Sequence, residues 1–249
     1  MNLLTAIRAH VALVAIVGAL SAHAEGHHWS YGKHSGPAEW GELDQAFASC
    51  QLGKVQSPID IRGAKAADLP AIKFDYKPAP LKVIDNGHTI QVNYAPGSTM
   101  EVGGTRYELV QFHFHKPSEE KIAGKAHDMV AHLVHKGPDG KLAVVAVLID
   151  KGGANPVINT IWKNLPKEKE KEVTAAATID AASLLPADKG YFTFQGSLTT
   201  PPCSEEVRWF VLKNPVKIEQ AQIAAFGKLY PMNARPTQPL NGRPIEATR

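Results

Sequence analysis

A succession of short apolar and β-branched runs between residues 56 and 150 constrains the fold of this chain more than any other feature. Each run has the length of a strand, and turn signals such as Asn86-Gly87 and Gly103-Gly104 separate neighbouring runs. We predict strands over residues 72–76, 81–85, 89–94, 107–115, 129–135, 142–150, 191–194 and 207–212. Helical spacing of apolar residues predicts helices near 39–48, 157–165 and 218–230. The expected fold is mainly β with peripheral α, a single domain on a large, twisted, mostly antiparallel central sheet.

Size and charge bound the class of protein further. The chain has 249 residues, of which 44% are hydrophobic, and this is enough material for one large domain with a substantial core. The formal net charge of +3 reflects a mild lysine excess with acidic residues interspersed. Because no basic block stands beside aromatic residues, we expect no nucleic acid among the partners of this protein.

The first residues have the pattern of a removable signal peptide. Arg8 provides the positive charge, residues 11–20 form an apolar stretch, and Ala22-His23-Ala24 has the small-x-small form of a cleavage site. The apolar stretch is too short to span a bilayer, so we favour a signal peptide over residues 1–24 rather than an uncleaved membrane anchor. No later segment has the length and apolar character of a membrane span.

The two cysteines, Cys50 and Cys203, lie far apart in the sequence. If the chain is exported to an oxidising compartment, an even pair of cysteines favours one disulfide. A zinc site made from these cysteines is disfavoured, because neither has a second cysteine at close spacing.

Histidines on two predicted strands form a candidate metal site. Side chains alternate across a strand, so His113 and His115 point to one face while Phe112 and Phe114 point to the other, into the core. If the strand at 129–135 pairs antiparallel with this one, His132 can lie beside the two histidines. Three neutral imidazoles leave one tetrahedral position open, as a catalytic zinc requires. Spacing alone, however, does not select His132 as the third ligand.

Eight segments, taken in order, identify a family resemblance. They are His28-Trp-Ser-Tyr-Gly32, Gln56-Ser-Pro-Ile-Asp-Ile61, Asp85-Asn-Gly-His88, Gln111-Phe-His-Phe-His115, Ser118-Glu119, Ala131-His-Leu-Val134, Gly196-Ser-Leu-Thr-Thr-Pro-Pro202 and Asn233-Ala-Arg-Pro-Thr-Gln-Pro-Leu240. Together they resemble the alpha carbonic anhydrases across essentially all of residues 25–249, which would form the catalytic domain. The signal peptide and the cysteine pair resemble the secreted bacterial branch, which implies a periplasmic enzyme with a Cys50–Cys203 disulfide.

The resemblance implies a chemistry for the histidine cluster. His113, His115 and His132 would bind Zn²⁺, and a zinc-bound hydroxide would attack CO2 to give bicarbonate and a proton. Thr199 matches the family residue that accepts a hydrogen bond from this hydroxide and donates its own to a glutamate, here Glu119. His88 matches the residue that carries the proton to buffer, a role that suits the ordinary pKa of histidine.

The resemblance also assigns the lining of the substrate pocket. The apolar wall that faces CO2 would consist of Val134, Val144, Leu198, Val207 and Trp209, with Thr199 and Thr200 beside it. A polar wall would hold water and consist of Tyr31, Asn86, Gln91, Gln111 and Thr200. Sulfonamides and anions are expected as inhibitors, and the protein is expected to be a monomer or a homodimer. The family also implies cis peptide bonds at Ser57-Pro58 and Pro201-Pro202.

One position departs from the family pattern. Ligand histidines usually donate their second N–H to a fixed acceptor, and Gln111 and the carbonyl of Asn233 suit His113 and His115. The usual partner of the third ligand is a glutamate two residues earlier, where this chain has Val130. Asp128 or a water molecule is the expected substitute. We therefore expect faster zinc loss to chelators than in relatives with the glutamate, and slower loss in Val130→Glu.

Two other functions remain open from the sequence. A non-catalytic, carbonic anhydrase-like binding protein would keep the fold without the metal, but the three histidines, Glu119 and Thr199 are all present. A periplasmic zinc-binding protein would have tracts rich in histidine and acids around an exposed site, and only His27-His28 resembles such a tract. Measurement of CO2 hydration with and without a chelator separates these alternatives.

Overall fold

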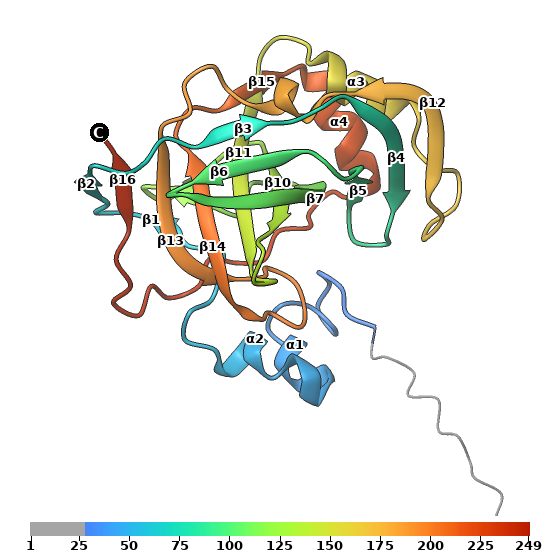
Figure 1. Ribbon diagram of the computed structural model, residues 1–249. Helices are drawn as coiled ribbons and strands as arrows, with labels where there is room; N and C mark the ends of the chain where they lie inside the picture. Colours follow the sequence, from blue (N-terminus) through green and yellow to red (C-terminus); the bar gives the residue numbers. More distant parts are fainter. Residues whose placement is uncertain (1–27) are drawn as a thin grey trace, which may run out of the picture.

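A strongly curved central sheet dominates the computed structural model, which describes residues 28–249 (Figure 1). The predicted signal peptide and residues 25–27 lie outside the described residues. The strands are β1 Asp60–Ile61, β2 Lys65–Ala67, β3 Lys73–Asp75, β4 Ala79–Asp85, β5 Ile90–Asn93, β6 Thr99–Val102, β7 Thr105–His115, β8 Lys121–Ile122, β9 Lys125–Ala126, β10 Met129–Lys136, β11 Leu142–Lys151, β12 Val173–Ile179, β13 Tyr191–Ser197, β14 Glu205–Leu212, β15 Val216–Ile218 and β16 Glu246–Thr248. The helices are α1 Trp40–Leu43, α2 Ser49–Leu52, α3 Pro156–Lys163 and α4 Gln220–Leu229, with 3-10 turns η1 Gln45–Phe47 and η2 Ala181–Leu184.

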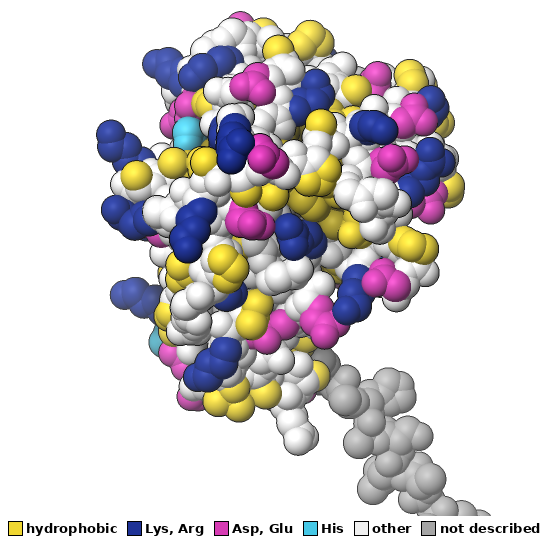
Figure 2. All heavy atoms as spheres, turned by 60° about the vertical axis from the view of Figure 1, so that its left-hand side comes forward, with side chains coloured by type: hydrophobic (Ala, Val, Ile, Leu, Met, Phe, Trp, Pro, Cys, Tyr) yellow, Lys and Arg dark blue, Asp and Glu magenta, His cyan; other side chains and the backbone are white. Residues whose placement is uncertain are grey.

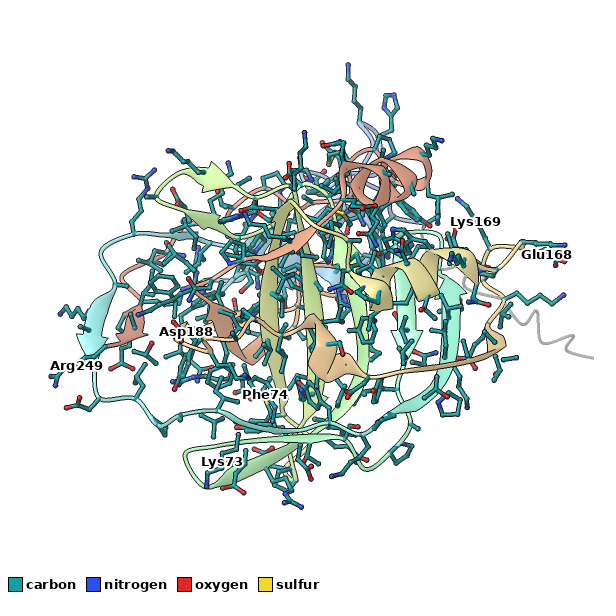
Figure 3. The ribbon with its side chains drawn as sticks, turned by 90° about the horizontal axis from the view of Figure 1, so that it is seen from above. Lys73, Phe74, Glu168, Lys169, Asp188 and Arg249 are labelled. Atoms are coloured by element: carbon teal, nitrogen blue, oxygen red, sulfur yellow. A yellow bond between two sulfur atoms is a disulfide. The ribbon has the colours of Figure 1, made fainter. Side chains whose placement is uncertain are left out.

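Most neighbouring strands of the sheet run antiparallel, as predicted. The main path is β12-β4-β5-β7-β10-β11-β14-β13-β16-β2, and only β11–β14, β11–β15 and β16–β2 are parallel pairs in this sheet of residues 28–249. Seen from above, Arg249 lies just after β16 and Glu168 and Lys169 lie before β12, at opposite edges of the molecule (Figure 3). The long strands β7, β10 and β11 occupy the middle of this order, and nearly all side chains of β10 and β11 are buried.

The two faces of the central strands contact different sets of side chains. Phe112 and Phe114 on β7 are buried in the larger apolar core, and the ring of Phe114 packs against Trp162 of α3 and Phe226 of α4. Helices α3 and α4 therefore cover this face (Figure 1). The other face carries the histidines and a second apolar cluster that includes Val134 of β10. This alternation follows from the period of two along a strand.

The segment before β1 differs from the single helix predicted near 39–48. It consists of α1, η1 and α2, three short pieces, because Asp44 between the first two adopts an extended conformation with φ −151° and ψ 143°. The Asp44 side chain accepts a hydrogen bond from the backbone N–H of Ala46, which is typical of an aspartate that ends one helix and caps the next. The other two predicted helices are present as α3 and α4.

A disulfide joins this segment to the rest of the protein. Cys50 of α2 is bonded to Cys203, which lies in the connection between β13 and β14, 153 positions later. Both cysteines pack against Trp40 in a small separate apolar cluster. The peptide bonds Ser57-Pro58 and Pro201-Pro202 are cis, as expected, and Lys116-Pro117 is also cis.

The surface carries mixed charge. On the face with β13 and β14, lysine and arginine side chains alternate with acidic ones and surround a hollow with hydrophobic side chains at its floor (Figure 2). Within residues 28–249, no helix has the length and apolar character needed to cross a membrane.

Candidate metal centre

Three histidines from the two central strands converge on one point. His113 and His115 lie on β7, and His132 lies on β10 directly opposite His113 in the antiparallel register. One ring nitrogen of each histidine lies within 4.8 Å of one ring nitrogen of each of the others. The predicted pairing of these strands is therefore confirmed, and it places His132 beside the two histidines of β7.

In each ring, one nitrogen has a hydrogen-bond acceptor, and the other nitrogen is therefore free to bind a metal ion. Gln111 Oε1 lies 2.9 Å from Nδ1 of His113, and the backbone carbonyl of Asn233 lies 2.7 Å from Nδ1 of His115. The corresponding nitrogen of His132 is Nε2, which lies 3.1 and 3.2 Å from the two carboxylate oxygens of Glu120. Because these oxygens accept, the free nitrogens are Nε2 of His113, Nε2 of His115 and Nδ1 of His132.

The cluster fits a metal ion. His115 Nε2 is fully buried and has no hydrogen-bond partner within residues 28–249, and an unpaired buried nitrogen requires an explanation. Burial lowers the pKa of His113 to about 3 and, together with the neighbouring His132, lowers the pKa of His115 well below its ordinary value. Both rings are therefore neutral near pH 7, as metal ligands must be. Three histidine nitrogens without a cysteine match an open zinc site.

The partner of His132 corrects one expectation from the sequence. Asp128 makes no hydrogen bond to His132; its side chain is exposed, and its Oδ2 accepts the backbone N–H of Lys151 at 2.8 Å. Glu120 contributes the carboxylate instead, from the loop between β7 and β8. The expectation of faster zinc loss rested on a missing carboxylate, so the structure removes its basis.

A second buried carboxylate lies on the metal side of the histidines. Oε2 of Glu119 lies 3.5 Å from Nε2 of His115 and 3.8 Å from Nδ1 of His132. Its Oε1 accepts the backbone N–H of Arg235 at 2.7 Å. Burial raises the pKa of Glu119 to about 7, while His132, the hydroxyl of Thr199 and the Arg235 N–H act in the opposite direction. Thr199 is thereby placed next to Glu119.

A small cavity leads from the histidines toward the surface. It has a volume of about 110 Å³ and its lining includes Trp29, Tyr31, Asn86, His88, Thr89, Gln91, Gln111, His113, His115 and Thr200. All five residues of the expected polar wall are in this set. The ring of His88 stacks on Trp29 with centroids 3.6 Å apart, and burial, followed by the charge of His28, lowers the pKa of His88. The side-chain amide of Asn233 donates to the backbone carbonyl of His88 at 3.0 Å, and the backbone carbonyl of Asn233 accepts from the ligand His115, so this residue links the His88 loop to the histidine cluster.

The expected apolar wall is also brought together. Val134, Val144, Val207 and Trp209 are buried in the second apolar cluster, and Leu198 packs against it. The ring of Trp209 lies 4.9 Å from that of His132, so this cluster borders the metal ligands. The structure therefore places the apolar cluster against His132 and the polar cavity against His113 and His115.

Comparison with known proteins identifies the family. The family model for eukaryotic-type carbonic anhydrase matches residues 35–249. This chain belongs to the alpha carbonic anhydrase family. A carbonic anhydrase of Nostoc sp. is 44% identical over 229 residues, covering 89% of this chain and 86% of the relative.

Two solved structures agree with this assignment. A hyperthermostable carbonic anhydrase from a hydrothermal vent chimney superposes with a TM-score of 0.87 at 47% identity, over 89% of this chain and all of that one. An alpha carbonic anhydrase from Thermovibrio ammonificans, in complex with the inhibitor sulfanilamide, superposes with a TM-score of 0.85 at 40% identity, over 90% of this chain and all of that one. Alpha carbonic anhydrases use zinc, and the cluster of His113, His115 and His132 fits that metal.

Two neighbours of the carbonic anhydrase site were not assigned from the sequence. Glu120 follows Glu119 directly, but nothing in the local pattern shows that its side chain reaches His132. Trp29 lies within a segment that resembles the family, but its stacking on His88 joins residues far apart in the chain. In both cases the role depends on a tertiary contact, which the local sequence pattern does not show.

Proposed function

We propose that this alpha carbonic anhydrase catalyses the reversible hydration of CO2 to bicarbonate and a proton, with zinc held by His113, His115 and His132. The observation that carries the proposal is the convergence of three ring nitrogens within 4.8 Å, each ring having its other nitrogen paired with an acceptor. Zinc bound there supplies a Lewis acid that lowers the pKa of a coordinated water. The remaining roles belong to residues of the chain.

Glu119 and Thr199 orient the nucleophile in this proposal. The Glu119 carboxylate is fixed by the backbone N–H of Arg235 and faces the ligand nitrogens of His115 and His132. If Glu119 accepts the hydroxyl proton of Thr199, the Thr199 oxygen can only accept from the reacting group. That arrangement selects one orientation, which lowers the entropic part of the barrier.

Substrate and proton use opposite walls of the site. CO2 is small and apolar, so the cluster of Val134, Val144, Leu198, Val207 and Trp209 suits it, with Thr200 at the border of the polar cavity. His88 lies in the lining of that cavity, and its imidazole can accept a proton and release it to buffer near neutral pH. Sulfonamides and anions should compete for the same position, as the sulfanilamide complex of the Thermovibrio relative suggests.

We also propose that residues 1–24 are a signal peptide and that residues 25–249 act in the periplasm. The support is the pattern of residues 8–24 and the Cys50–Cys203 disulfide, which persists in oxidising compartments. Mass measurement of the protein purified from the periplasmic fraction tests the cleavage site.

The test of the function combines zinc content with CO2 hydration, followed by the pH change. We expect one zinc per chain, activity that a chelator abolishes and added zinc restores, and inhibition by a sulfonamide. His113→Ala should lose both zinc and activity. His34→Ala, which replaces an exposed histidine outside the cluster, should retain both. A wild-type protein without zinc and without CO2 hydration would contradict the proposal and would support the non-catalytic binding protein.

A further inference from the structure

Glu120 is a fully buried carboxylate whose two oxygens both lie within hydrogen-bond distance of the same ring nitrogen, Nε2 of His132. We propose that Glu120 is the positioning residue that fixes the tautomer and the orientation of His132 for zinc. The proposal rests on the zinc site of the proposed function. It assigns to a loop residue the task that the family pattern gives to the strand position now held by Val130.

Within residues 28–249, no other side chain is placed to serve His132 in this way. Val130 is two residues before His132 on β10, on the same face, and is fully buried in the second apolar cluster. That cluster also includes Ile59 and Ile61, so the space beside Val130 is apolar. Asp128 is engaged by the N–H of Lys151. The N–H of His132 therefore has its acceptor only because Glu120 enters from the loop.

The loop that carries Glu120 is tied to the strand that carries His132. The hydroxyl of Ser118 donates to the backbone carbonyl of Glu120 at 2.7 Å and accepts the backbone N–H of His127 at 2.8 Å. The backbone N–H of Ser118 in turn donates to the carbonyl of His127 at 3.0 Å. His127 lies just before β10, and Lys121, directly after Glu120, begins the pairing of β8 with β1. Glu120 is therefore held on both sides, as a residue that positions a ligand must be.

The charges around His132 favour a divalent cation. Glu119 faces its Nδ1 at 3.8 Å and Glu120 faces its Nε2, so two consecutive carboxylates flank one imidazole. The formal charges of two carboxylates and one Zn²⁺ sum to zero. An anionic acceptor on the far nitrogen also makes the imidazole a stronger ligand, and loss of such a partner typically weakens metal binding about 10- to 100-fold.

The experiment measures the rate at which purified zinc-loaded protein loses zinc to an excess of chelator. Glu120→Ala should lose zinc about 10- to 100-fold faster than the wild type. Glu120→Gln is nearly isosteric and keeps an oxygen that can accept from His132, so it should lose zinc at a rate between those of the wild type and Glu120→Ala. It should also fold if the alanine variant does not. Glu205→Gln is the matched control, because Glu205 accepts from Val55 and Gln56 away from the histidines and its loss should leave the rate unchanged.

The thermal midpoint of the metal-free proteins separates positioning from a general structural role. If Glu120 only supports the loop, metal-free Glu120→Ala will have a lower thermal midpoint than the metal-free wild type but will lose zinc at the wild-type rate. This result overturns the proposal. Rates within two-fold of the wild type for both Glu120 variants also overturn it. In either case a wild-type protein that holds one zinc and hydrates CO2 leaves the proposed function intact, whereas a wild-type protein without zinc defeats the function itself.

Discussion

The Cys50–Cys203 disulfide should contribute a large part of the stability of this protein. It joins residues 153 positions apart, and in the chain-entropy model closing such a loop stabilises the folded state by about 5 kcal/mol, largely by restricting the unfolded chain. For a domain of this size, 1 kcal/mol corresponds to about 2–4 °C in the thermal midpoint. The double variant Cys50→Ala, Cys203→Ala should therefore unfold about 10–20 °C below the wild type.

The same bond should affect the active site. The backbone N–H of Cys203 donates to the carbonyl of Thr200 at 2.8 Å, and the carbonyl of Cys50 accepts from the guanidinium of Arg235 at 2.8 Å. Arg235 also donates its backbone N–H to Glu119. Removal of the disulfide should loosen both contacts, so we expect reduced CO2 hydration at temperatures where the variant is still folded.

Denaturant unfolding at fixed zinc concentration is the assay, because bound metal stabilises the folded state by mass action. Reductant should lower the unfolding free energy of the wild type to that of the double variant and should leave the variant unchanged. A double variant within about 1 kcal/mol of the wild type would refute the loop-closure argument.

Three further predictions concern individual side chains. His135 is buried against Tyr76, and burial lowers its pKa to about 3, so the folded protein is fully stabilised above pH 6.5 and loses stability as the pH falls. His135→Gln should remove about 2 kcal/mol of the stability loss between pH 7 and pH 5, measured by denaturant unfolding. An unchanged dependence of the unfolding free energy on pH would contradict this. His88→Ala should slow CO2 hydration several-fold in dilute buffer and much less in concentrated buffer, and equal slowing in both would argue against proton transfer. Thr199→Val should lower kcat/KM about 100-fold with zinc content unchanged. Thr199→Ser keeps the hydroxyl beside Glu119 and should lower kcat/KM far less. Equal losses in the two variants would show that the hydroxyl has no role.

Strands in the middle of the sheet could be predicted from the sequence. The runs at 107–115, 129–135 and 142–150 became β7, β10 and β11, because their β-branched and apolar residues satisfy both local preference and burial. Short strands such as β2, β6 and β16 were missed, since three or four residues carry little pattern and form strands only where a partner is present. The split of the predicted helix at 39–48 depended on the backbone conformation of one aspartate, Asp44.

The sequence by itself determined that His113 and His115 share a face and that Phe112 and Phe114 oppose them, because alternation along a strand is a local property. The third histidine, His132, was named by the family resemblance and not by its spacing, and only the tertiary structure decided which side chain accepts from it. The register of β10 on β7 sets His132 opposite His113, and a loop held by Ser118 sets Glu120 behind it. These contacts join segments whose relative positions follow from packing of the whole sheet, so no local pattern in the chain encodes them.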